Sequence, residues 1–233
     1  KKIISCLGCR YNIFHNKISV QDVHRFVNSQ PCDIICLIMA VRMLIQAGHP
    51  ALKKSNKGII NANLPKIKKM RKDLVDTMNK TGLIGIAAPQ IAQNYMMFVT
   101  HPRKTKSRNL AKGDILRTYI SPKIIFESKI KNIIYEGCGS VVSGDLFGPV
   151  SRPEEIEIEA LDENGQKFKL RCNGILSRVI QHEYDHLIGV EFLEKVNDYK
   201  KIMVGDYYRK NIRNSKLQKQ NSLITKIEYK KSK

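Results

Sequence analysis

Two histidines four positions apart constrain this chain more than any other feature. The stretch "VIQHEYDHLIGVEF", residues 179–192, contains the pattern His-Glu-x-x-His at His182, Glu183 and His186. Positions i and i+4 share one face of a helix, so both imidazoles can reach a single divalent ion. Glu183 lies about 100° further round the helix, where it can act on a water beside the ion. Two imidazoles supply only half of a tetrahedral site, so another ligand must come from elsewhere.

Downstream candidates for that ligand are few. The third histidine of the metzincin pattern would fall at Phe192, and Glu191 follows too closely behind the helix. Upstream, Cys138 stands between two glycines in "EGCGS", residues 136–140, where the backbone can approach a metal closely. A Cys/His/His set leaves one position open for water, which is the arrangement of catalytic sites. Cys172, by contrast, has ordinary strand neighbours and is expected to pack as a small apolar residue.

A third stretch, "IGIAAPQ" at residues 84–90, is compact enough to lie along a ligand groove. The side-chain amide of Gln90 can donate to an oxyanion. Taken alone, this run is equally explained by a tight connection between a helix and a strand.

The pattern of apolar residues predicts an α+β fold. A helix is expected from a cap at Asn63 to Gly82, and a second at residues 175–187. Strands are expected at 95–99, 116–120 and 123–127, with Pro122 separating the last two, followed by a hairpin of 155–161 and 167–171. We therefore expect mostly antiparallel sheets packed around a central metal-binding helix that carries His-Glu-x-x-His.

The charge balance is strongly basic, with 41 Lys and Arg against 21 Asp and Glu. This excess favours polyanionic partners such as RNA, although a solvated lysine-rich surface explains it equally well. We expect an N-terminal extension at 1–40, a catalytic domain at 41–197 and a basic tail at 198–233. Within residues 200–233, eleven Lys or Arg face only Asp206 and Glu228, which indicates either a solvated tail or an RNA- or ribosome-facing one. No apolar run is long enough to span a bilayer.

The N-terminal extension contains two cysteine pairs, Cys6 with Cys9 and Cys32 with Cys36. They are candidates for a structural zinc site, with buried or incidental cysteines as the favoured alternative. Six cysteines in 233 residues form no disulfide framework and suit a reducing compartment. We expect the cytoplasm, or a mitochondrion or plastid if residues 1–40 belong to a targeting extension.

Together the three stretches resemble the peptide deformylase family. Its motifs are G-x-G-[IL]-A-A-x-Q, E-G-C-x-S and Q-H-E-x-x-D-H-L, which appear here in the same order as "LIGIAAPQ", "EGCGS" and "QHEYDHL". The resemblance covers roughly residues 41–197. It implies a metallohydrolase that removes the formyl group from N-formylmethionyl nascent chains, with Fe(II) expected and Zn(II), Ni(II) or Co(II) as alternatives. Leu83 replaces the first motif glycine and is expected to narrow the substrate groove, and Gly139 replaces a larger residue.

The resemblance also implies a role for individual residues. The metal ligands would be Cys138, His182 and His186, with Glu183 as the acid and base. Gln90 and the backbone N–H of Gly139 would donate to the formyl oxygen. The substrate would be contacted by Gly85 along its backbone, and by Ile86 and Val179 as walls of a methionine pocket.

Two other functions remain open at this stage. A metal-dependent peptidase would use the same His-Glu-x-x-His helix but lacks its downstream ligand here. A non-catalytic, ribosome- or RNA-binding descendant of the family would account for Leu83 and the basic tail. The sequence indicates no oligomeric state.

Overall fold

The computed structural model describes residues 41–106 and 108–231, and residues 40–233 form one compact unit. The N-terminal cysteine pairs lie outside the described residues. Within the described ranges, no helix combines the length and apolar character needed to cross a membrane.

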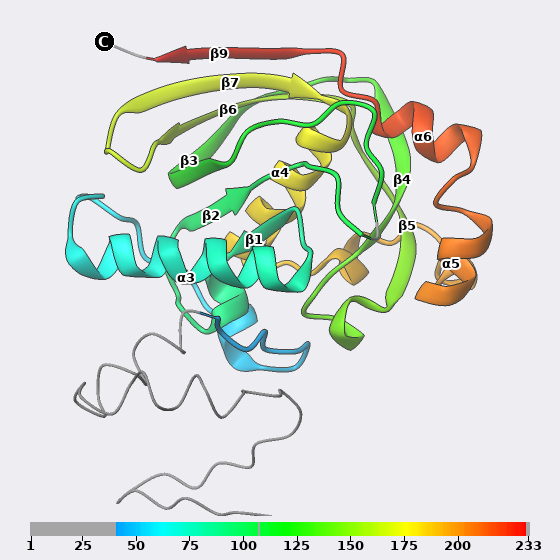
Figure 1. Ribbon diagram of the computed structural model, residues 1–233, viewed down its shortest axis with the longest axis horizontal. Coiled ribbons are helices and arrows are strands. Elements are labelled where there is room, and N and C mark those ends of the chain that lie inside the picture. Colours follow the sequence, from blue (N-terminus) through cyan, green and yellow to red (C-terminus); the bar gives the residue numbers. More distant parts are fainter. Residues whose placement is uncertain (1–40, 107, 232–233) are drawn as a thin grey trace, which may run out of the picture. The chain divides into compact units, whose positions relative to one another are not determined.

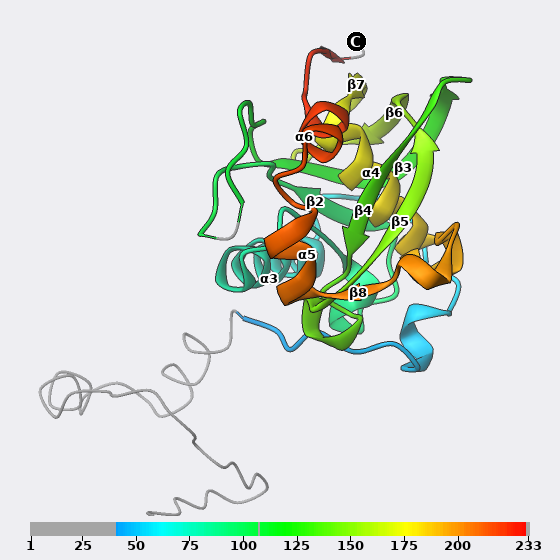
Figure 2. The same cartoon turned by 90° about the vertical axis from the view of Figure 1, so that its right-hand side faces the viewer.

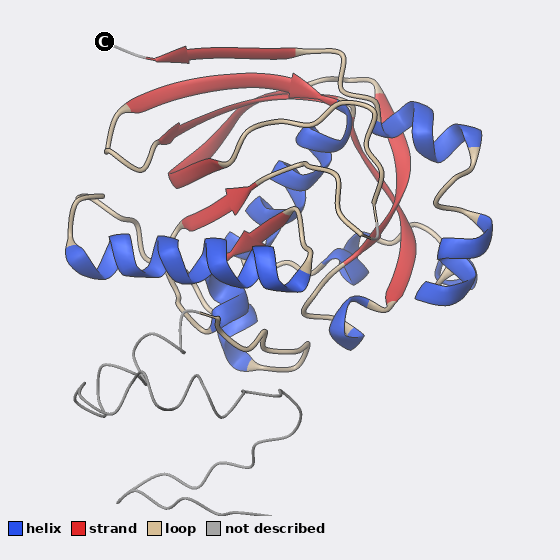
Figure 3. Cartoon of the chain, in the orientation of Figure 1, coloured by secondary structure: helices blue, strands red, loops and turns tan. Residues whose placement is uncertain are grey.

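Two antiparallel sheets and four α-helices make up the unit (Figures 1 and 3). The first sheet has the strand order β1 (Gly85–Ala87), β2 (Met97–Thr100), β3 (Arg117–Glu127), β6 (Glu155–Leu161), β7 (Lys167–Asn173) and β9 (Ile227–Lys231). The second has β4 (Lys131–Gly137), β5 (Leu146–Pro153) and β8 (Met203–Val204). The α-helices are α3 (Pro65–Thr81), α4 (Gly174–Leu187), α5 (Gly205–Asn211) and α6 (Lys216–Ser222). Short 3₁₀ helices cover Pro50–Leu52, Ala88–Ile91, Val142–Gly144, Phe192–Lys195 and Tyr199–Lys201. The expected α+β class with antiparallel sheets is confirmed.

Helix α4, which contains His-Glu-x-x-His, lies between the two sheets (Figure 1). Its apolar side, including Leu176 and Ile180, joins a core with Phe98 and Phe168 of the larger sheet. Its polar side meets the smaller sheet, where Arg178 donates to the backbone carbonyl of Val150 at 2.9 Å. The helix is therefore held on both sides, which positions the residues along it rigidly.

Helix α3 covers the opposite face of β1 and β2. It begins at Pro65 and ends before Gly82, whose φ of 71° terminates the helix as expected. The residue at its N-terminal cap position is Leu64, not Asn63, and no side chain caps this end. Because α3 and α4 enclose β1 and β2, both strands are buried along their whole length.

Strand β3 continues through Pro122, which was expected to separate two strands. The pairing with β6 shifts in register between Ile120 and Lys123, and Ser121 adopts a φ of 46°. Such a bulge accommodates a proline, which has no N–H to donate to a neighbouring strand. The Oγ of Ser121 accepts from the N–H of Ile59 at 2.8 Å and thereby anchors the bulge.

Residues 203–231, which the sequence assigns to a basic tail, form β8, α5, α6 and β9. Strand β9 pairs with β7, with Ile227 opposite Cys172. On α6, Gln218 accepts from the N–H of Tyr135 at 3.1 Å and donates to its carbonyl at 3.3 Å. The segment therefore runs along β4 and then along β7 (Figure 2).

Candidate active site

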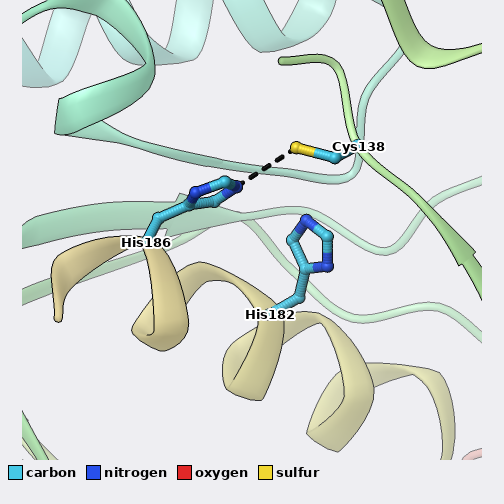
Figure 4. Close-up of side chains that lie close together, drawn as sticks. All are labelled: Cys138, His182 and His186. Atoms are coloured by element: carbon cyan, nitrogen blue, oxygen red, sulfur yellow. Dashed lines mark hydrogen bonds between the residues drawn. The ribbon is translucent and has the colours of Figure 1, made fainter. Parts of the chain in front are cut away.

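Cys138, His182 and His186 form a cluster of potential metal ligands. Cys138 follows the end of β4, and the two histidines lie one turn apart on α4. Their ligand atoms all lie within 4.8 Å of one another, and the Sγ of Cys138 is 3.2 Å from the Nε2 of His186 (Figure 4). A thiolate with two imidazoles suits a transition metal such as iron, zinc, nickel or cobalt. The donor set therefore fits a divalent ion of this kind.

A buried network of charged groups orients His182. The Nδ1 of His182 lies 3.0 Å from the Oε2 of Glu136, so with Nδ1 as donor its Nε2 is left for a metal. Glu136 also accepts from Arg152 at 2.7 and 3.0 Å and from Arg178 at 2.8 Å. Arg152 in turn donates to Asp185 at 2.6 Å.

Burial alone would raise the pKa of Glu136. The charge of Arg152 and the hydrogen bonds from His182 and Arg152 outweigh burial and hold that pKa well below its usual range. The carboxylate is therefore ionised and fixed, as a partner that orients a histidine ligand should be.

Sequence reasoning missed this network. Glu136 and Asp185 stand inside the recognised motifs but received no role, and Arg152 and Arg178 received none either. One signal was present: Arg178 precedes His182 by four positions on the same predicted helix, so the two share a face.

Glu183 is buried beside these donors, and its Oε2 has no hydrogen-bond partner among the described residues. Burial raises the pKa of Glu183 to about 7. Strand β1 approaches this side chain closely, since a Cβ added to Gly85 would lie 2.5 Å from both the Oε1 of Glu183 and the Cγ1 of Val179. Only glycine permits this contact between β1 and α4.

Gln90 and Gly139 each contribute an N–H donor beside Cys138. The Oε1 of Gln90 accepts from the N–H of Ala87 at 2.8 Å, which turns its Nε2 toward the Sγ of Cys138 at 3.5 Å and the Oγ of Ser140 at 3.3 Å. In the described part of the chain, the N–H of Gly139 donates to no acceptor. Donors arranged in this way can stabilise an oxygen that develops negative charge.

One cavity of about 710 Å³ joins these groups. Its lining includes seven of the predicted residues: Gly85, Gln90, Cys138, Gly139, Val179, His182 and Glu183. Ile86, expected in the wall of a methionine pocket, does not line this cavity and packs in the core with residues of α3. Alternate residues of a strand face opposite sides, so Gly85 and Ala87 face α4 while Ile86 faces α3.

Known proteins with similar sequences are peptide deformylases. The family model described as polypeptide deformylase matches residues 41–202. Peptide deformylase 1 of Ralstonia nicotianae is 32% identical over 162 residues, covering 70% of this chain and 90% of the relative. The tomato protein peptide deformylase 1B, chloroplastic, is 33% identical over 157 residues, covering 66% and 53% respectively.

Among solved structures, the Met-Ala-Ser-bound class I type b peptide deformylase of Acinetobacter baumannii superposes with a TM-score of 0.63 at 25% identity. The alignment covers 67% of this chain and 98% of that one. A family model that matches most of the chain, a relative of 32% identity matched along 90% of its length and a shared fold lead to one conclusion: the chain belongs to the peptide deformylase family.

Proposed function

We propose that this chain hydrolyses the formamide bond of N-formylmethionyl peptides, releasing formate and a free amino terminus. The observation that carries the proposal is the convergence of the Cys138, His182 and His186 donors with Glu183 and Gln90 beside one cavity. The family membership and the structural match to an enzyme crystallised with Met-Ala-Ser support the same substrate class.

A divalent ion held by Cys138, His182 and His186, which we propose to be Fe(II), would supply Lewis-acid activation of water and of the formyl carbonyl. Glu136 fixes His182 by accepting from its Nδ1, with Arg152 and Arg178 holding the carboxylate in turn. These residues keep the donors in place without taking part in bond making.

Glu183 is the proposed proton carrier. Its unpartnered Oε2 accepts a proton from the attacking water and delivers it to the nitrogen of the methionine amine as the C–N bond breaks. The water oxygen forms the new bond to the formyl carbon, so formate and the free amine account for all atoms. Gln90 Nε2 and the N–H of Gly139 donate to the formyl oxygen while it carries negative charge.

The substrate backbone is proposed to run along β1. This strand stands at the edge of the larger sheet, so the side of β1 away from β2 is available to an extended peptide. Because Gly85 has no side chain, the peptide backbone can come close to β1 at this position. Val179 is the proposed contact for the methionine side chain.

Turnover of formyl-Met-Ala-Ser by anaerobically purified protein tests the proposal, beside Glu183→Ala, with metal content determined on the same samples. We expect deformylation that is lost in the variant while the metal stays bound. Full metal occupancy without turnover would instead favour a non-catalytic binding protein. Cleavage of unformylated peptides would favour a peptidase.

We also propose contact with the ribosome through the outward-facing cations of residues 200–231. Lys200, Lys210, Lys216 and Lys230 are exposed there, and such a surface attracts RNA in a salt-dependent way. Exchanging these four lysines for glutamine should lower ribosome affinity at low salt. Equal affinity of both proteins across a salt titration would dismiss the contact.

For the compartment, we propose the cytoplasm, with a plastid or mitochondrion as the alternative. The tomato relative, whose name places it in the chloroplast, supports keeping the alternative. Imaging the full chain with a C-terminal fluorescent tag separates them.

A further inference from the structure

The cavity extends beyond the metal donors to a second, strongly basic end. Two segments wall it there: residues 104 and 108–112 of the loop between β2 and β3, and residues from the end of α5 to the end of α6. Five cations line this part, which we call the basic end: Lys104, Arg108, Lys112, Arg213 and Lys219. The acidic residues in the lining are Glu136 and Glu183, and both belong to the catalytic end.

None of these five cations forms an ion pair within the described ranges. Neighbouring arginines do find partners: Arg117 pairs with Asp114 at 2.5 Å, and Arg209 on α5 pairs with Asp145 at 3.1 Å. The basic end therefore lacks the counter-charges that Arg117 and Arg209 have.

Arg108 and Arg213 are the most enclosed of the five. Both are partly buried, and the guanidinium of Arg213 lies 5.6 Å from the ring centre of Tyr208. Burial lowers the pKa of Arg108, and the charge of Arg213 contributes to the same effect. Two like charges in a partly dehydrated space are unfavourable, and an anion between them would relieve both the repulsion and the lost hydration.

We propose that the basic end binds an acidic side chain of the substrate, carried downstream of its formylated methionine. This inference rests on the proposed deformylase function. A peptide laid along β1 with its formyl group at Glu183 would extend along the same cavity, whose far walls carry Arg108 and Arg213. A cavity that is continuous with the catalytic groups suits one carboxylate better than a polynucleotide, which needs a long open surface.

This specificity would be an addition to the family's shared domain. Arg213 and Lys219 follow residue 202, where the match to the family model ends. Gln218 holds α6 against β4 through the backbone of Tyr135, so this wall is built into the fold.

The test compares formyl-Met-Ala-Glu-Ser, formyl-Met-Ala-Gln-Ser and formyl-Met-Ala-Lys-Ser, all as C-terminal amides so that no terminal carboxylate interferes. Further peptides carry the Glu, Gln or Lys at position two or at position four, so that an acidic side chain is presented to the basic end from each of these positions. We expect kcat/KM in the order Glu, Gln, Lys in at least one register, with about tenfold between Glu and Gln, carried mainly by KM. The preference should shrink as salt is added.

Arg108→Gln and Arg213→Gln should each reduce the Glu-to-Gln ratio toward one, while Arg213→Lys should retain most of it. Lys80→Gln is the matched control, because Lys80 is exposed on α3 and does not line the cavity; its ratio should equal that of the parent. Melting temperatures of all variants separate loss of preference from loss of fold.

Equal kcat/KM for the Glu and Gln peptides in every register would overturn the inference while leaving the proposed function standing. A lack of turnover on every peptide would count against the proposed function instead. Dissociation constants of the same peptides for Glu183→Ala protein then still decide the inference. Loss of affinity for a single-stranded RNA oligomer in the arginine variants, with the peptide preference intact, would assign the basic end to RNA.

Discussion

Leu83 occupies the space that a side chain at position 139 would need. A Cβ added to Gly139 would lie 3.1 Å from the Cδ1 of Leu83 and 2.8 Å from the Cδ1 of Leu44. Leu83 stands where the family motif has glycine, and Gly139 where it has a larger residue. The two departures lie beside each other in the cavity wall, so the larger side chain stands at position 83 here instead of at position 139.

A swap of the two residues should therefore be better tolerated than either change alone. Gly139→Leu is expected to destabilise the fold by about 1–3 kcal/mol through overpacking and to lower kcat/KM. Adding Leu83→Gly should recover part of both losses, because the contact with Leu44 remains, and the coupling should be about 1 kcal/mol. Urea unfolding and formyl-Met-Ala-Ser turnover of both single variants and the double variant measure it. Strictly additive losses would show that the two positions are independent.

Gly85→Ala should impair catalysis much more than folding. Its methyl group would lie 2.5 Å from the Oε1 of Glu183, so the carboxylate or β1 must shift. Displacements of this size cost roughly 100-fold in rate. Steady-state kinetics with metal analysis should show low kcat at normal metal content. Gly58→Ala is the matched control, since its nearest neighbour, the Oγ of Ser121, is 4.0 Å away. Comparable activity of the two variants would contradict the assigned contact.

Glu136→Gln should weaken both metal binding and stability. The change leaves Arg152 and Arg178 buried with one carboxylate fewer and removes the charged partner of His182. We expect metal affinity to fall by about 10- to 100-fold and the free energy of unfolding by roughly 3–5 kcal/mol. Competition with a metallochromic chelator and urea titration test both parts. Glu159→Gln, which removes a surface carboxylate paired with Lys167, should leave stability close to that of the parent.

Val142→Gly should stabilise the protein. Val142 has a φ of 47°, a left-handed conformation that a β-branched residue adopts only with strain, and its side chain is 63% exposed. Glycine relieves the strain at the expense of little buried surface, so we expect a gain of about 1 kcal/mol in chemical denaturation. Val204→Gly provides the contrast, because Val204 is also exposed but has a φ of −71°. That variant should lose stability, and a loss in both would refute strain at position 142.

Local patterns predicted much of this fold. The apolar spacing of α3, with Pro65 and Gly82 at its ends, specifies a helix without reference to the rest of the chain. Strict alternation in β6 and β7 around a short turn likewise specifies a hairpin. The ligand cluster was predictable because three short motifs each keep a fixed internal spacing.

Contacts between distant residues escaped prediction. Pro122 predicts a break between two strands, and only the register shift with β6, a contact between distant residues, allows β3 to continue through it. The ion pair of Arg152 with Glu136 joins the neighbouring strands β4 and β5, and that with Asp185 reaches across to α4, which no local pattern encodes. Strand β9, with the sequence "IEYKK", carries one partly buried position and four exposed ones. Its sequence therefore lacks the apolar alternation from which a paired strand is predicted.

The pairing of β9 with β7 also protects the larger sheet against association with other chains. A chain interrupted at residue 202 would keep Cys138, His182 and His186, yet it would expose the hydrogen-bonding edge of β7 to any extended peptide. With β9 in place the outermost strand carries Lys230 and Lys231, and lysine on an edge strand disfavours further strand addition. The segment after residue 202 therefore has two roles: residues between 208 and 224 contribute to the cavity wall, and β9 protects the edge of the larger sheet against strand addition.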